Sequence, residues 1–168
     1  MDRQHILDEL TVNMIVYEDS AARIQHLLKV HSFARLIGVG EGLDEDTLFT
    51  LETASIVHDI GIKPAIRIYG SGDGPYQEKE GMPQAEKMLG EMGFDRAVID
   101  RVVYLVGHHH TYTDIDGPDY QILVEADFLV NLFEQNESEE AIKSVYDKIF
   151  VTETGKKLMR EQFGLASC

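Results

Sequence analysis

Apolar residues along this chain recur with the three- and four-residue spacing of helices, and no stretch alternates convincingly between apolar and polar residues as a half-buried strand does. The pattern predicts a weak first helix over residues 4–17 and a strongly periodic second helix from 21 to about 37. A third helix should start after Asp44, whose side chain can accept hydrogen bonds from free backbone N–H groups, and end at Gly61. The first third of the chain is therefore predicted to be helical.

The pattern changes over residues 62–83. Glycine and polar residues dominate the stretch YGSGDGPYQEKEGMP, which predicts a long loop, and loops of that length in compact domains tend to be lids or binding loops. Helical spacing returns over 84–92, from 95 to about 109, and over 119–135. After the polar segment NESEE, one or two closing helices are expected to end near Phe163.

No internal repeat, low-complexity tract or long linker divides the chain. Its length of 168 residues is ordinary for one domain. We therefore predict a single all-α domain over residues 1–168, a compact bundle of about six to eight helices. In this bundle the C-terminal helices at 138–165 should pack against the region 20–135.

Charge and cysteine content narrow the functions that this chain can have. It carries 30 Asp and Glu against 15 Lys and Arg, and a surface this acidic repels the phosphate backbone of long nucleic acids. A local basic pocket for one small anionic ligand is still compatible with that balance. The only cysteine is Cys168, so neither an internal disulfide nor a thiolate metal cage is available.

The sequence also bears on where the protein acts. No apolar run approaches the roughly 20 residues that a membrane span needs. The N-terminal stretch MDRQHILDELTVN carries acids, unlike a secretory signal. We therefore expect a cytoplasmic protein without a membrane partner, and the sequence leaves open whether it forms a homo-oligomer.

Four His and Asp side chains are candidates for one divalent metal site. His26 lies on an otherwise apolar helical face, and His58 and Asp59 are adjacent in the last turn of the third predicted helix. Asp127 lies on a core stripe of the helix over 119–135, where an ionised carboxylate is costly unless a partner compensates it. A divalent cation can compensate two carboxylates and accept two imidazoles. This donor set suits manganese, iron, nickel, cobalt or zinc, or magnesium with more water retained.

Each of these residues also has an ordinary structural explanation when it is considered alone. His26 can be a core histidine with satisfied hydrogen bonds, and Asp127 can cap a backbone turn or pair with Arg23 or Lys63. His31 is expected in the core or behind the site rather than among the ligands. The order and spacing of the four residues therefore carry more weight than any one of them.

That order resembles the H…HD…D signature of the HD-domain metal-dependent phosphohydrolases. His26 follows Arg23 in RIQHLLKV, the pair His58 and Asp59 lies in SIVHDIGI, and Asp127 lies in the EAD segment of ILVEADFLVN. An HD dipeptide alone occurs by chance, whereas HDIG at a helix end with these flanking ligands is specific. The resemblance implies an all-helical fold around one or two divalent metals, and hydrolysis of phosphate esters or anhydrides.

The resemblance also implies roles for single side chains. In this family the metal activates water and polarises the phosphoryl oxygen, and Asp59 or a nearby acid helps to position the water. Lys63 is a candidate to neutralise a bound phosphate, the alternative being an exposed loop lysine. Arg23 is expected to reach the phosphate or to pair with a ligand carboxylate. The expected substrate is a small phosphorylated molecule, with nucleotides the favoured class.

A run of three histidines follows Val106 in the segment VGHHHTY. On a continued helix His109 and His110 follow the inward stripe, whereas His108 turns away. Family members with two metals carry extra histidines near this place. His109 and His110 are therefore candidates to bind a second metal or to hydrogen-bond a substrate phosphate as imidazolium, and the alternative is a solvated helix end.

The segment between the HD pair and this run departs from the binuclear members of the family. Those members have a further histidine, often beside a proline, where this chain has EKEGMPQA. Glu80 is the candidate to replace it as a ligand or to act as general acid or base. The departure argues against a full two-metal site, and the chain also lacks the GYP signature of the cyclic-di-nucleotide branch.

Two other classes of function stay open. Some HD-type folds use a di-iron site for oxygen-dependent cleavage, which here requires a second iron bound through His109, His110 and Glu80. The other class is a metal or nucleotide sensor that binds its ligand without turnover. Metal content and turnover distinguish these classes from a hydrolase.

Overall fold

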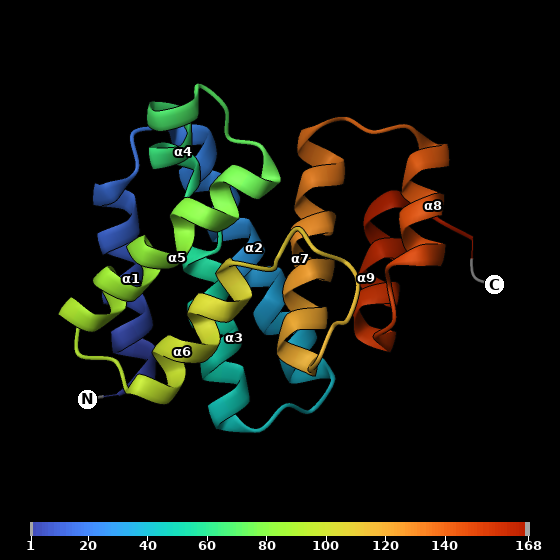
Figure 1. Ribbon diagram of the computed structural model, residues 1–168. Helices are drawn as coiled ribbons and strands as arrows, with labels where there is room; N and C mark the ends of the chain where they lie inside the picture. The colour runs from blue at the N-terminus through green and yellow to red at the C-terminus, as the bar shows by residue number, and fades with distance from the viewer. Residues whose placement is uncertain (1, 167–168) are drawn as a thin grey trace.

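The computed structural model describes residues 2–166, and over these residues it contains nine α-helices and no strand (Figure 1). The all-helical fold class predicted from the sequence is confirmed. The helices, in chain order, are α1 (Arg3–Tyr17), α2 (Ala21–Gly40), α3 (Glu45–Val57), α4 (Ile62–Tyr69), α5 (Gly74–Glu91), α6 (Arg96–Val106), α7 (Pro118–Glu134), α8 (Glu139–Lys148) and α9 (Glu153–Phe163).

Helices α2, α3 and α7 form the centre of the fold. Each of them packs against the other two, and α3 also packs against α1 and α6. Residues 50–57 of α3 and 122–127 of α7 are buried without interruption, as expected for helices that have neighbours on every side. Figure 1 shows α7 between α6 and the pair α8 and α9, with α1 and α5 on the opposite side of the molecule. The end of α3 and the middle of α7 are therefore the most enclosed parts of the chain.

The prediction of a long loop over residues 62–83 is wrong, because α4 and the first half of α5 occupy this segment. Only residues 70–73 separate the two helices, with Gly70 at a φ of 69° ending α4. The buried side of α5 has a regular four-residue spacing, but two of its members are not apolar, so the hydrophobic pattern did not reveal it. These buried residues are Gln77, Gly81, Ala85 and Leu89. The extra helix also explains why the count exceeds six to eight.

Two glycines set how closely α5 approaches the end of α3. A Cβ atom on Gly61 would collide with the carbonyl oxygen of Gln77, and a Cβ on Gly81 would lie 2.8 Å from Cγ1 of Val106. The glycine that follows the HD pair is therefore required by packing against α5. This contact holds the end of α3 in place.

The C-terminal helices are joined to the centre through a buried carboxylate. Helix α9 packs against α2 and α7. Glu125 of α7, which is fully buried, accepts hydrogen bonds from the backbone N–H groups of Val151 and Thr152, from the Thr152 hydroxyl and from Gln121. These bonds fix the connection between α8 and α9 against α7.

Among the described helices, none is both long and apolar enough to cross a membrane.

Candidate metal centre

Four side chains from α2, α7 and the end of α3 converge on one point. Nε2 of His26 lies 3.1 Å from Oδ1 of Asp127, 3.2 Å from Nε2 of His58 and 3.2 Å from Oδ2 of Asp59. Nε2 of His58 lies 3.3 Å from the same oxygen of Asp59 and 3.4 Å from that of Asp127. The two histidines and Asp127 are buried and Asp59 is partly exposed, so Asp59 is the member of the cluster that solvent reaches.

Hydrogen bonds on the far side of both imidazoles orient them toward this point. Nδ1 of His58 donates to the carbonyl oxygen of Ser55 at 2.7 Å, and Nδ1 of His26 donates to Oε1 of Glu134 at 2.5 Å. Each ring therefore presents Nε2 to the cluster. A carboxylate or carbonyl behind the imidazole is the usual arrangement for a metal-binding histidine.

Glu134 was not among the candidates from the sequence. It lies seven residues beyond Asp127 in α7, which places it two turns along the same face. That spacing is the only signal that the sequence offers. Its contact with His26 spans 108 residues of chain and depends on how α2 packs on α7.

The charges within the cluster perturb every member. Burial by itself lowers the pKa of His26, but its hydrogen bonds to Asp127 and Asp59 outweigh burial and raise that pKa to about 11. Burial also lowers the pKa of His58, but the carboxylates of Asp59 and Asp127 outweigh burial and raise that pKa to about 10. In return, the imidazoles hold the pKa of Asp59 and of Asp127 below the ordinary value despite burial. Two carboxylates thus favour positive charge at the two Nε2 atoms.

The donor set and its dimensions fit a divalent cation. Ligand atoms about 2.1 Å from a metal lie about 3.0 Å apart at octahedral angles and about 3.4 Å apart at tetrahedral ones. The separations of the two Nε2 atoms from each other and from the oxygens of Asp59 and Asp127, 3.1–3.4 Å, fall in that range. Two imidazole nitrogens and two carboxylate oxygens suit manganese, iron, cobalt, nickel or zinc. The arrangement can therefore hold one such ion.

A second cluster shares Asp59. Its other oxygen, Oδ1, lies 3.3 Å from Nε2 of His109, and the ligand atoms of Asp59, His109 and His110 all lie within 4.8 Å of one another. Nδ1 of His109 donates to the carbonyl oxygen of Val106 at 2.8 Å, which turns Nε2 toward Asp59. Nε2 of His110 is buried and has no hydrogen-bond partner among the described residues. Asp59 thus faces both clusters, one with each oxygen.

Comparison with known proteins agrees with this geometry. The family model of the HD domain matches residues 23–150. The chain belongs to the HD domain family. It is also similar to a solved structure described as a predicted HD superfamily hydrolase from an uncultured Thermotogales bacterium, with 27% sequence identity and a TM-score of 0.64 over 96% of this chain and 84% of the other. A search of curated proteins finds no match.

In this HD domain the histidine run does not continue a helix, contrary to the prediction of a helix to about residue 109. Helix α6 ends at Val106, and Gly107 caps it. The chain then turns, so that His108 stacks on Tyr104 with ring centroids 4.0 Å apart, while His109 enters the core at 1% exposure. The inward direction of His109 therefore comes from this turn and not from helical spacing.

Burial and the neighbouring His109 lower the pKa of His110 to about 4. The His110 ring is therefore neutral at pH 7. A neutral ring suits a metal ligand or a single N–H donor. It argues against the alternative in which His110 holds a phosphate as imidazolium.

Several contacts hold the turn that carries these histidines. The Tyr120 hydroxyl donates to the carbonyl oxygens of His108 and Thr111. Oε1 of Glu78 accepts from the backbone N–H of His110 at 2.9 Å. Farther along the connection to α7, Arg101 pairs with Asp116 and Asp119. The α6–α7 connection is thus fixed at both ends.

The structure places Glu80 away from the histidine run. Its Oε1 accepts a hydrogen bond from the Tyr69 hydroxyl at 2.9 Å, between α5 and the end of α4. Glu78 is the α5 acid that contacts the run. The two acids lie two residues apart, so they point in different directions from the helix. The sequence segment was the right one, but only the helical structure shows which of its acids faces the histidines.

Arg23 and Lys63 are both engaged at the connection between α1 and α2. Arg23 pairs with Glu18 and Asp19. Nζ of Lys63 donates to the carbonyl oxygen of Tyr17 at 2.7 Å and lies 5.0 Å from the centre of its ring. Neither cation pairs with Asp127, the structural alternative raised from the sequence. Their roles toward a phosphate stay predictions.

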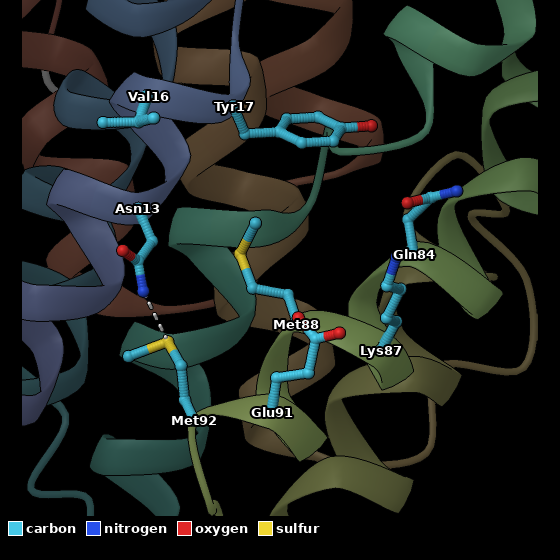
Figure 2. Close-up of a pocket in the computed structure, with 8 residues that line it drawn as sticks. All are labelled: Asn13, Val16, Tyr17, Gln84, Lys87, Met88, Glu91 and Met92. Atoms are coloured by element: carbon cyan, nitrogen blue, oxygen red, sulfur yellow. Dashed lines mark hydrogen bonds between the residues drawn. The ribbon is translucent and has the colours of Figure 1, made fainter.

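A separate groove of about 440 Å³ lies between α1 and α5 (Figure 2). Figure 2 shows Met88 directed between the two helices and Asn13 hydrogen-bonded to the sulfur of Met92. None of the clustered His and Asp residues lines this groove. We therefore do not place the chemistry there, and its side chains serve below as controls.

Proposed function

We propose that this protein is a metal-dependent phosphohydrolase that cleaves a phosphate ester or anhydride of a small molecule, with a nucleotide as the favoured substrate. Membership of the HD domain family and the His and Asp clusters support a metal-dependent hydrolase in general. The solved relative is itself described as a predicted hydrolase. The acidic surface favours a small substrate over a long nucleic acid.

One observation carries the proposal: Nε2 of His26 and Nε2 of His58 lie 3.2 Å apart, and each lies 3.1–3.4 Å from an oxygen of Asp59 and an oxygen of Asp127, which are separations that one cation requires. When bound, such a cation supplies Lewis acidity that makes a water more acidic and withdraws charge from the phosphoryl group. His26, His58 and Asp127 would hold it from the buried side, leaving the partly exposed Asp59 toward solvent.

The remaining side chains of the site would handle substrate and protons. Asp59 is a partly exposed hydrogen-bond acceptor that can orient a water for in-line attack. The free Nε2 of His110 is directed into the same cluster and can hydrogen-bond a phosphoryl oxygen when it carries the proton. Lys63 and Arg23 lie farther out and would reach a phosphate only by leaving their present partners.

Metal content and turnover in matched variants test the proposal. Wild type, His26→Ala and His31→Ala are purified without added metal or chelator. His31 lies on the same helix but pairs with Glu52 at 2.9 Å, outside the cluster. We expect metal in wild type and His31→Ala, loss of metal in His26→Ala, and metal-dependent phosphate release from phosphorylated metabolites. Asp59→Asn, which keeps the shape of the side chain, should abolish that release. Metal retained by His26→Ala would show that the site is elsewhere.

The second cluster keeps a di-iron oxygenase as the other candidate function. Asp59, His109 and His110 are placed so that a second ion could share Asp59. The observation that favours an oxygenase would be two irons per chain with substrate-dependent oxygen uptake. Phosphate release without oxygen consumption would exclude it.

A further inference from the structure

A cavity of about 400 Å³ opens beside the second cluster, between the α6–α7 connection, α7 and α8. Cavities of this size are in the range that binds small molecules. Ala141 and Val145 of α8 also line it, so the cavity extends from the connection toward the C-terminal helices. The residues that matter for its chemistry are His110, Tyr112, Phe128, Asn131, Gln135 and Ala141.

The cavity shares one residue, His110, with the second cluster. On α7, Asn131 and Gln135 lie four and eight residues beyond Asp127, on the same side of the helix. At the rise of an α-helix their backbone positions are about 6 Å and 12 Å along the axis from Asp127. A phosphate hydrogen-bonded by His110 would therefore have this row of α7 within reach of its leaving group.

The walls combine aromatic rings with amides. The rings of Tyr112 and Phe128 lie with centroids 5.1 Å apart at 50°, next to His110, whose Nδ1 is 3.4 Å from the Tyr112 hydroxyl. The amides of Asn131 and Gln135 follow along α7. No side-chain hydrogen bond joins either amide to another described residue, so both amides are available to a ligand. Aromatic surface binds a flat ring, and amides can pair with both donors and acceptors on its edge.

The cavity offers nothing to bind further phosphates. Among the described residues that line it, none is Lys or Arg, and the one charged side chain is the acid Glu137. A second or third phosphate in this cavity would face that acid without a compensating cation. The leaving group that fits is therefore uncharged.

We infer that this cavity binds the uncharged, aromatic leaving group of a nucleoside monophosphate, so that the bond cleaved is a phosphomonoester and not an anhydride. The inference rests on the proposed function and deepens it. Asn131 and Gln135 then determine which ring is accepted, and Tyr112 and Phe128 bind its face. None of these four residues belongs to the clusters that would hold metal.

Kinetics on matched substrates test the inference with the metal-loaded full chain. Ribose 5-phosphate carries the phosphate and sugar without the base, and it is compared with the four common nucleoside 5′-monophosphates, ADP and ATP. We expect kcat/KM for at least one monophosphate to exceed that for ribose 5-phosphate by about tenfold or more, as base stacking on aromatic rings contributes. ADP and ATP should be poorer than the matching monophosphate by a similar factor.

Two variants alter the cavity in different ways. Asn131→Leu removes the amide at similar size, and Ala141→Phe fills the space. Both should reduce the preference for the nucleotide over ribose 5-phosphate to within about threefold, while the metal content stays as in wild type. Asn13→Leu, in the groove of Figure 2, is the matched control and should change neither.

The outcomes separate this inference from the proposed function. Equal kcat/KM on ribose 5-phosphate and on every nucleotide, or a preference that survives both variants, overturns the cavity assignment and leaves the phosphohydrolase in place. Faster cleavage of ADP or ATP overturns the charge argument. No metal-dependent phosphate release from any of these compounds overturns the proposed function itself.

Discussion

Glu134 lies behind His26, and its replacement tests whether a carboxylate outside the cluster sets the metal affinity. Its Oε1 accepts the Nδ1 proton of His26 at 2.5 Å, and its Oε2 lies 3.1 Å from Nζ of Lys29. The substitution Glu134→Gln keeps the size of the side chain and an oxygen that can accept the same proton. It removes only the negative charge, which makes Nε2 of His26 a weaker ligand.

The expected size of the effect follows from the position of Glu134. Loss of such a partner typically costs about 10-fold to 100-fold in metal affinity. The Glu134 side chain is 25% exposed, so solvent screens part of its charge. We therefore expect a loss of about 10-fold for Glu134→Gln and a value nearer 100-fold for Glu134→Ala, which loses the hydrogen bond as well.

The assay is a competition titration of zinc or manganese against a chelating indicator, with Glu91→Gln as the control. Glu91 is an exposed acid of α5 that contacts none of the clustered residues. The metal-free variants should unfold within a few degrees of wild type, because the pair is near the surface. If Glu134→Gln binds metal as tightly as wild type while His26→Ala loses it, the carboxylate does not orient His26 and the reasoning is refuted.

Three further predictions follow from the same contacts. Gly61→Ala should lower the free energy of unfolding by about 1–3 kcal/mol because its Cβ meets α5, whereas Gly90→Ala, which has open space around it, should raise that free energy by about 0.5–1 kcal/mol. Chemical denaturation measures both values, and equal effects would contradict the packing argument. Tyr120→Phe should lower the free energy of unfolding by about 1–2 kcal/mol and should lower metal occupancy of the second cluster more than that of the first, measured as metal per chain. Unchanged metal per chain would mean that the Tyr120 hydroxyl does not position the turn that carries the histidines. Because the pKa values of His26 and His58 are raised to about 11 and 10, a metal that binds below pH 10 must displace a proton from each ring, and its affinity should rise with pH. Calorimetry in buffers of different ionisation enthalpy should detect about two protons released per metal bound, and no release would show that both rings are neutral before metal binds.

Much of the metal centre could be predicted from the sequence. His26 and Asp127 each occupy a position on an apolar helical face where a solvated role is implausible, and helical periodicity alone exposes that conflict. The HD pair stands out because a histidine and an acid end a helix whose preceding turns are apolar. Each residue alone also has an ordinary structural explanation, so the order of the four along the chain was needed to assign them to one candidate site.

The surroundings of the centre could not be predicted in the same way. The buried side of α5 contains a glutamine and a glycine, and no larger residue fits at Gly81 because its Cβ would meet Val106 of α6. Whether Glu78 or Glu80 faces the histidines depends on the rotation of α5, which the loop prediction missed altogether. The direction of His109 depends on a turn held by Tyr120 from another helix.

The sequence by itself determined the helical fold class, because periodicity is a property of single helices, and the order of His26, His58, Asp59 and Asp127 along the chain made them the candidate ligands. Only the tertiary structure decided the orientation of those residues, the sharing of Asp59 between two clusters, and the cavity that begins at His110. These depend on distances between helices that are far apart in the chain. Such distances are set by the packing of whole side chains against one another, which no local pattern records.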